Sequence, residues 1–198
     1  MYKFFFFMDP RIHELFEESI AVKQAYAADQ ANLEALQAVV DETIAVFRRG
    51  GKALFCGNGG SAADAQHIAA ELSGRFYLNR APLFAEALHV NSSFLTAVAN
   101  DFGYDAAFAR MVEAAGREGD ILFVMSTSGN SPNILQAAAK GRELGMTIVG
   151  LTGSGGGKLK PLCHHCLEVP SNDTPRIQEV HITIGHLLCE LVEKALFQ

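Results

Sequence analysis

The sequence has little of three things that would place it in a special class of protein. Only four of its 198 residues are cysteine (Cys56, Cys163, Cys166 and Cys189), too few and in too apolar a setting for a disulfide framework. We therefore expect a reducing, cytoplasmic compartment. No apolar run approaches the ~20 residues of a membrane-spanning helix. Acidic residues outnumber basic ones by 22 to 16 without any basic run, which argues against nucleic acid or an anionic membrane as the main partner.

The remaining composition is that of an ordinary globular protein, with 49% hydrophobic and 19% charged residues. The absence of an internal linker, low-complexity tract or short repeat predicts a single domain over residues 9–198. The apolar core of the opening MYKFFFFM is shorter than the ~7–15 residues of a signal peptide's apolar region. Residues 1–8 are therefore expected to be an extension or a disordered segment, and our hypothesis is that Met8 is the natural start. Asp9 and Pro10 are expected to cap and open the first helix.

Hydrophobic periodicity divides the chain into two parts. Residues 9–50 have a helical pattern with a predicted break at Ala27–Asn32, which indicates an N-terminal pair of helices. Over residues 51–198, short apolar runs alternate with helical stretches, a pattern typical of a parallel sheet covered on both faces. The sequence thus predicts a doubly wound α/β domain with a five-stranded parallel sheet. The expected strands are 52–57, 83–90, 120–126, 146–152 and 165–170. The expected helices in this part are 61–76, 91–116, 131–144, 156–163 and 174–197.

Two loops at the ends of expected strands have the composition of phosphate-binding loops. The first is GNGGS at 57–61, and the second is STSGNS at 126–131, directly before a helix that opens with Pro132. Glycines let the backbone approach a ligand, and a helix N-terminus offers free N–H groups. The alternative is that these residues only satisfy turns and helix caps. Because two such loops follow strands of one domain, we expect a phosphate monoester held by neutral donors.

The first loop also matches the dinucleotide-binding fingerprint G-x-G-x-x-G/A through Gly57, Gly59 and Ala62. That fingerprint requires an acidic residue about 20 positions on, at the end of the next strand. The next expected strand ends in His89-Val90-Asn91 instead, and Glu86 lies inside it. We therefore prefer a sugar-phosphate loop to a nicotinamide loop.

Two helices carry polar residues at spacings that place them on one side. His67 and Glu71 are four residues apart, on adjacent turns. Gln178 and His186 lie two turns apart on the last helix, about 80° apart around its axis, and His186 is expected to be partly buried. Together these side chains could enclose a divalent metal such as Zn²⁺, or the carboxylate and imidazole could transfer protons. The alternative is that each is solvated or a satisfied core residue, and spacing by itself favours this alternative over a metal.

The motif Cys163-His164-His165-Cys166 resembles part of a zinc site, but no second ligand pair follows at zinc-finger spacing. Coincidence is the preferred interpretation of this motif, and metal binding or redox chemistry is the alternative.

Four segments in order, CGNGGSAADAQHIAAE, TAVANDFGYD, STSGNSPN and TPRIQEVHITIGH, resemble the phosphoheptose isomerases of the sugar-isomerase (SIS) fold. The resemblance covers essentially all of residues 9–198. It implies one Zn²⁺ per subunit, bound by His67, Glu71, Gln178 and His186, and a homotetramer with active sites completed by neighbouring subunits. It also implies that Glu71 and His186 are the catalytic acid–base pair. The substrate-binding residues that it implies are Asn58, Gly59, Gly60, Ser61, Glu71, Asn100, Asp101, Ser126, Thr127, Ser128, Ser131 and Gln178.

The reaction implied by the resemblance is the conversion of sedoheptulose 7-phosphate to D-glycero-D-manno-heptose 7-phosphate, for the lipopolysaccharide core of Gram-negative bacteria. We expect Glu71 to move a proton from C1 to C2 through an enediolate while His186 moves protons between the oxygens. Two alternatives exist within the same fold. One is a non-catalytic adaptor that binds the replication initiator DnaA, and the other is a sugar-phosphate-sensing module of a regulator. The presence of all four residues implied as metal ligands favours the enzyme.

Overall fold

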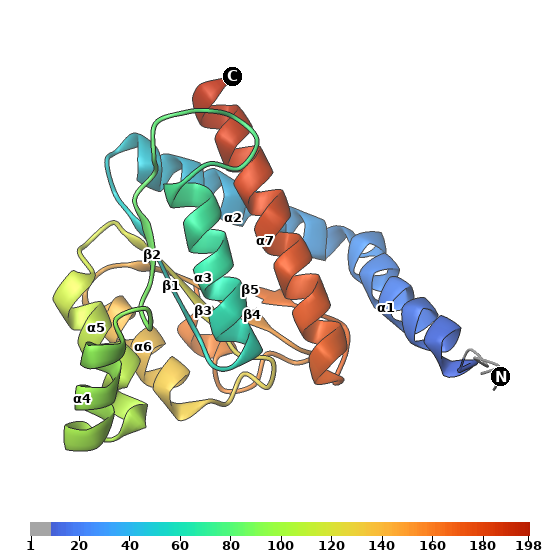
Figure 1. Ribbon diagram of the computed structural model, residues 1–198. Coiled ribbons are helices and arrows are strands. Elements are labelled where there is room, and N and C mark those ends of the chain that lie inside the picture. Colours follow the sequence, from blue (N-terminus) through green and yellow to red (C-terminus); the bar gives the residue numbers. More distant parts are fainter. Residues whose placement is uncertain (1–8) are drawn as a thin grey trace, which may run out of the picture.

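The five predicted strands form one parallel sheet in the order β2-β1-β3-β4-β5 (Figure 1). A computed structural model describes residues 9–198, so the predicted extension at residues 1–8, with the proposed start at Met8, lies outside the described residues. The predicted α/β class with a five-stranded parallel sheet is confirmed. The strands are β1 Ala53–Gly57, β2 Ala85–Ala87, β3 Ile121–Met125, β4 Thr147–Thr152 and β5 His165–Glu168.

The N-terminal pair of helices breaks at Asp29, inside the predicted interval, because this residue has an extended backbone and its carboxylate caps the second helix. The first helix begins one residue later than predicted. Pro10 is already helical at the cap position, and Asp9 Oδ1 accepts a hydrogen bond from the Arg11 N–H at 2.9 Å. The α-helices are α1 Arg11–Ala28, α2 Gln30–Arg48, α3 Gly60–Ser73, α4 Ser92–Phe102, α5 Ala107–Ala115, α6 Pro132–Glu143 and α7 Thr174–Phe197.

Two helix predictions were wrong in extent, and glycine explains both. The stretch 91–116 is two helices, α4 and α5, separated by the 3₁₀ turn η1 (Tyr104–Ala106), because Gly103 has a φ of +83° that ends α4. The predicted helix 156–163 is reduced to the single 3₁₀ turn η2 (Lys160–Leu162). Three consecutive glycines before it, Gly155–Gly157, all have positive φ and form a loop.

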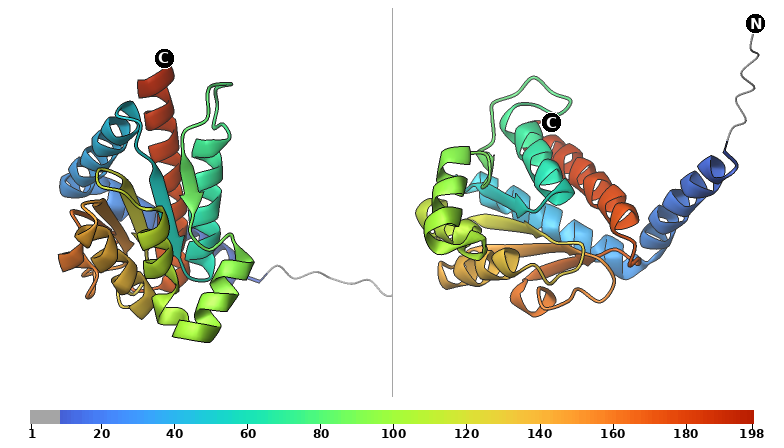
Figure 2. Two further views of the ribbon diagram at one scale, coloured as in Figure 1. Left: turned by 90° about the vertical axis from the view of Figure 1, so that its left-hand side faces the viewer. Right: turned by 60° about the horizontal axis from the view of Figure 1, so that its bottom comes forward.

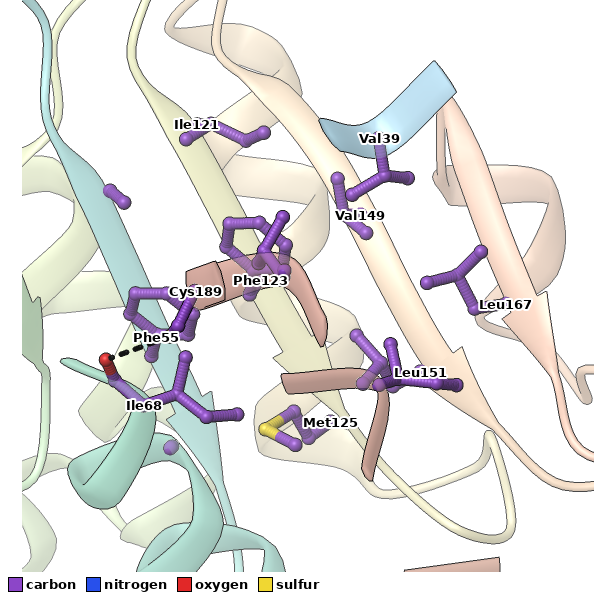
Figure 3. Close-up of a cluster of buried hydrophobic side chains, with 14 of the residues drawn as sticks. Val39, Phe55, Ile68, Ile121, Phe123, Met125, Val149, Leu151, Leu167 and Cys189 are labelled. Carbon is purple, nitrogen blue, oxygen red and sulfur yellow. Dashed lines mark hydrogen bonds between the residues drawn. The ribbon is translucent and has the colours of Figure 1, made fainter. Parts of the chain in front are cut away.

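Buried side chains form one apolar layer on each face of the sheet. Helices α2, α3 and α7 cover the face that carries Phe55 and Phe123, whose rings stack 4.6 Å apart (Figure 3). Helices α5 and α6 cover the other face. Because α3 and α7 pack against each other on the first face (Figure 1), residues 119 positions apart in sequence meet across them.

Helix α1 projects away from the sheet (Figure 2). It meets α7 near Arg176, whose guanidinium donates a hydrogen bond to the Leu15 carbonyl at 3.1 Å. Four apolar side chains of α1 remain exposed: Ile12, Leu15, Phe16 and Ile20. Within residues 9–198 no helix combines the length and apolarity needed to cross a membrane.

Candidate active site

Both predicted phosphate loops leave the sheet at the same edge. Gly57 and Met125, the last residues of β1 and β3, are paired neighbours in the sheet. The carboxyl edge of a parallel sheet is where α/β proteins bind their ligands. The turn after β1 requires glycine twice, because Gly59 has a φ of +54° and a Cβ on Gly57 would stand 2.5 Å from the Ser61 carbonyl oxygen. This turn carries the backbone directly into the N-terminus of α3.

Hydroxyl groups cluster in the second loop, at the N-terminus of α6. Ser126 Oγ lies 3.1 Å from Ser131 Oγ and 3.4 Å from Ser128 Oγ. The Thr127 carbonyl accepts the N–H of Gly153 at 2.9 Å, which ties the loop to the end of β4. Several neutral donors and a helix N-terminus around one point can bind a phosphate without a lysine.

Asn133, which sequence reasoning missed, joins the two loops. Its side-chain amide and that of Asn58 donate to each other at 2.8 and 2.9 Å, and Tyr104 adds a third hydrogen bond to Asn58 Oδ1 at 3.1 Å. Asn133 is buried. The Asn58 side chain, predicted to bind substrate, is therefore already engaged in holding the first loop against α6.

Helices α3 and α7 bring together three of the four predicted metal ligands. His67 Nε2 lies 3.0 Å from His186 Nε2, and it lies 3.4 Å from Glu71 Oε1. His186 is half-buried, as predicted, with its ring 6.0 Å from that of Phe76. His67 is exposed and Glu71 is half-buried, so the group faces open space. A carboxylate and two imidazoles at these distances can exchange protons with a bound molecule.

Gln178, the fourth predicted ligand, reaches the same helix through Asp64. The Gln178 Nε2 donates to Asp64 Oδ1 at 3.3 Å. The Gln178 side chain also fills the space beside Gly60, so that a Cβ on Gly60 would overlap it. Asp64 is buried and its Oδ2 has no hydrogen-bond partner. Burial raises the pKa of Asp64, against the opposing effect of Gln178, His67 and His186. Asp64 was missed by sequence reasoning, although its position three residues before His67 places it on the same side of α3.

The donor set fits a divalent metal in its chemistry but is not arranged as a ready site. Two imidazole nitrogens that share a tetrahedral Zn²⁺ at 2.0–2.1 Å would lie about 3.3 Å apart, close to the 3.0 Å between His67 and His186. Across residues 9–198, however, no three His, Cys, Asp or Glu side chains surround a common point. Completing a metal site would require Gln178 as a further donor and a rearrangement of the side chains.

Asn100 and Asp101 lie on α4 and are not joined to this group. Both are exposed, and among the described residues the only side-chain hydrogen bond of Asn100 is to Asp101 Oδ1, at 2.8 Å. The nearby contact with the first loop is made by Tyr104 instead. The structure thus brings together the residues on α3 and α7, and it leaves this predicted pair apart from them.

Comparison with known proteins places this arrangement in a family. The SIS domain model matches residues 16–153. The chain is 55% identical over 184 residues to the phosphoheptose isomerase of Mycobacterium tuberculosis, covering 93% of this chain and 94% of the relative. It is similar to the solved phosphoheptose isomerases of Neisseria gonorrhoeae (TM-score 0.87, 40% identity, 93% and 97% of the two chains) and Francisella tularensis (TM-score 0.88, 38% identity, 93% and 97%). This chain therefore belongs to the phosphoheptose isomerase family of SIS-domain proteins.

Proposed function

We propose that the protein is a ketose–aldose isomerase that converts sedoheptulose 7-phosphate to D-glycero-D-manno-heptose 7-phosphate. The proposal rests on the proximity of Glu71 and His186. Both side chains contact His67, and they lie on α3 and α7, the two helices that pack over one face of the sheet. The relatives named phosphoheptose isomerase, similar over more than nine tenths of this chain, support the same reaction.

The phosphate of the substrate would bind at Ser126, Thr127, Ser128 and Ser131, in the loop where the three serine hydroxyl groups lie together at the N-terminus of α6. The sugar would extend toward the first loop and contact Gly59, Gly60 and Ser61, whose backbone lies at the start of α3. Contacts with Asn58, Asn100, Asp101 and Gln178 remain predictions from the family resemblance.

Isomerisation requires a proton to leave C1 and a proton to arrive at C2. The Glu71 carboxylate would take the C1 proton, which leaves an enediolate, and would return it at C2. His186 would move a proton from the C1 hydroxyl to the C2 oxygen, so that the carbonyl passes from C2 to C1. Stabilising the negative charge of the enediolate is the costly part of such a barrier, and the imidazoles of His67 and His186, whose Nε2 atoms lie 3.0 Å apart, would supply that stabilisation.

A bound Zn²⁺, held by His67, Glu71, Gln178 and His186, would add Lewis-acid stabilisation of the substrate oxygens. The donor set and the spacing of the two imidazoles support this proposal. Zinc analysis of the purified protein, with and without His67→Gln, tests it through the metal content and without any assay of activity. We expect about one zinc ion per chain in the wild type and a loss of this zinc in the variant.

We further propose a homotetramer in a cytoplasmic setting. The exposed apolar side chains of α1, among them Phe16 at 67% exposure, support burial against other subunits. Half-exposed His67 supports an active site that a neighbouring subunit completes. All four cysteines are free thiols, which supports a reducing compartment. Sedimentation equilibrium of the full chain measures the subunit number.

The function is tested by incubating the purified chain with sedoheptulose 7-phosphate in D₂O. Because the proton held by Glu71 can exchange with solvent before it is returned, an enediolate route should place deuterium at C2 in part of the heptose product, seen by NMR. Turnover with no deuterium in product or recovered substrate would show that the C1 hydrogen is transferred without exchange, and the role of Glu71 would be contradicted if Glu71→Gln kept its turnover. No turnover with or without added Zn²⁺ would favour the non-catalytic adaptor.

A further inference from the structure

Two cysteines outside the candidate active site lie side by side at the edge of the sheet. Cys163 follows the 3₁₀ turn η2, and Cys166 lies in β5, the last strand in the sheet order. Both thiols are free and half-buried. Neither takes part in the proposed isomerisation, so that reaction does not explain the C-x-x-C motif.

Gly150 provides the space that brings the two sulfurs together. It lies inside β4, directly paired with Cys166, where glycine weakens a strand unless another group must approach closely. A Cβ on Gly150 would stand 2.5 Å from Cys163 Sγ and 3.6 Å from Cys166 Sγ. Cys163 Sγ therefore fills the volume that a side chain of β4 would occupy, and Cys166 Sγ lies in van der Waals contact with that volume.

The neighbours of the two thiols differ. Cys163 Sγ donates to the Leu159 carbonyl at 3.3 Å, whereas Cys166 Sγ lies 3.6 Å from the Thr152 hydroxyl. The neighbouring Cys163 thiol lowers the pKa of Cys166, against the effect of its burial, and the Thr152 hydroxyl lowers it further. The neighbouring Cys166 and burial raise the pKa of Cys163. Cys166 is thus the thiol with the greater thiolate character, which is the reactive form.

The other two cysteines differ from this pair in their burial. Cys56 and Cys189 are fully buried in the core, and burial raises the pKa of both thiols, that of Cys189 to about 12. Buried thiols of this kind are inert.

Metal binding is disfavoured as the role of the motif. His164 Nδ1 already accepts the N–H of Ile148 at 2.8 Å, which uses one ring nitrogen to hold the start of β5. Across residues 9–198 no three potential ligands of the types His, Cys, Asp and Glu surround a common point. Two adjacent thiols without further ligands are the arrangement of a redox pair.

We propose that Cys163 and Cys166 form a dithiol that a low-molecular-weight disulfide oxidises reversibly to an intrachain disulfide. The Cys166 thiolate attacks one sulfur of the small disulfide, forming a mixed disulfide and releasing one small thiol. Cys163, leaving the Leu159 carbonyl, loses its proton and attacks Cys166 Sγ, which forms the intrachain bond and releases the second small thiol. The protein loses two electrons and two protons, and the small disulfide is reduced to two thiols.

The test equilibrates the full chain in mixtures of glutathione and glutathione disulfide without oxygen, followed by acid quenching, alkylation and peptide mass spectrometry. Cys163 and Cys166 should lose their alkylation together, and a peptide with an intact disulfide should replace them. The oxidised-to-reduced ratio should follow the glutathione disulfide concentration divided by the square of the glutathione concentration, as one two-thiol exchange requires. Cys56 and Cys189 should remain fully alkylated after denaturation.

Single variants separate the two roles. In Cys163→Ser, Cys166 should stop at the mixed disulfide with glutathione, and in Cys166→Ser the remaining Cys163 should react at least tenfold more slowly. The proposal is overturned if both thiols stay reduced in the most oxidising mixture, or if each forms an independent mixed disulfide. Protection of both thiols by a metal that a chelator removes would also overturn it, in favour of a metal site.

Discussion

Arg80 and Glu193 form a buried ion pair that holds the segment after α3 against the last turns of α7. Arg80 Nε lies 3.0 Å from Glu193 Oε2, with the two side chains 3% and 2% exposed. The same carboxylate accepts three backbone N–H groups, those of Phe76, Tyr77 and Leu78, at 2.8–3.1 Å. Arg80 also donates to the Glu71 carbonyl at 3.0 Å, so this pair connects α7 to the helix end that carries the proposed base.

Removing one partner of this pair should destabilise the protein strongly, because the other charge stays buried without compensation. We expect Arg80→Met to lower the free energy of unfolding by about 3–5 kcal/mol, measured by urea denaturation. Amide hydrogen exchange at Phe76, Tyr77 and Leu78 should quicken as their acceptor loosens. The exposed pair Lys194–Glu190, on the same helix, is the matched control, and Lys194→Met should cost under about 1 kcal/mol. Equal losses in the two variants would show that the buried pair has no special role.

Glu71→Gln should remove turnover without unfolding the protein. The amide cannot accept the C1 proton, so kcat should fall by about 10²–10⁴-fold, the usual share of a general base. Because the Glu71 side chain is half-buried and the amide has nearly the same size and shape, the thermal midpoint should change by only a few degrees. Glu190→Gln, one turn beyond His186 on α7, removes a carboxylate that contacts Lys194 and should keep its activity. Near-normal kcat in Glu71→Gln would end the proposed mechanism.

The sequence allowed the fold to be predicted because its strands are continuous apolar runs that only a sheet covered on both faces can bury. The same pattern overstated the second strand, since β2 keeps only Ala85–Ala87 in the ladder. Helical periodicity could not show that Gly103 would take a positive φ and divide 91–116. The sequence alone does not show whether a glycine will continue a helix or adopt a positive φ and end it.

Within the site, sequence spacing could predict contacts made along one helix but not contacts between elements. The spacing of His67 and Glu71 showed that they share a face, and their atoms lie 3.4 Å apart. The 3.0 Å approach of His67 to His186 depends on how α3 crosses α7, which only the family resemblance could imply. Asn133 carries no motif of its own, so its pairing with Asn58 across 75 residues could not be predicted.

Asn133→Ala should weaken both the fold and substrate binding. It removes both hydrogen bonds between the two amides and leaves Asn58 Nδ2 without its acceptor in a half-buried position, and an unsatisfied group of this kind costs about 1–3 kcal/mol. The first loop, no longer tied to α6, should bind the sugar less well, so KM should rise while kcat changes less. Tyr104→Phe removes only the third hydrogen bond to Asn58, at an exposed position, and should have the smaller effect. An unchanged KM in Asn133→Ala would show that the amide pair is not needed to position the loop.

His181 should make the protein less stable in acid. This side chain is fully buried, with Nε2 donating to the Thr152 carbonyl at 3.1 Å, and burial lowers its pKa from 6.5 to about 4. Between pH 6.5 and pH 4, His181 is protonated in the unfolded chain but stays neutral in the folded chain. The free energy of unfolding therefore falls as the pH drops through this range. The loss attributable to His181 is on the order of 3 kcal/mol at the lower limit.

Urea denaturation at several pH values compares the wild type with His181→Gln, whose amide can still donate to Thr152. The variant is expected to be less stable at pH 7 but to lose less stability on acidification. Parallel curves for the two proteins would show that another group causes the acid sensitivity.

Gly150→Ala tests whether the two sulfurs occupy the space beside β4. In a strand interior, alanine is normally favoured over glycine by about 0.5–1 kcal/mol. Here its Cβ would stand 2.5 Å from Cys163 Sγ, and overpacking of this kind costs about 1–3 kcal/mol. The single variant should therefore be less stable than the wild type.

With Cys163→Ala the obstructing sulfur is gone, and adding Gly150→Ala to that background should be neutral or stabilising. A double-mutant cycle should thus give a coupling of 1 kcal/mol or more, as an order of magnitude for residues in contact. Additive effects would mean that Cys163 does not lie against Gly150 in solution, which would also remove the geometry on which the dithiol depends.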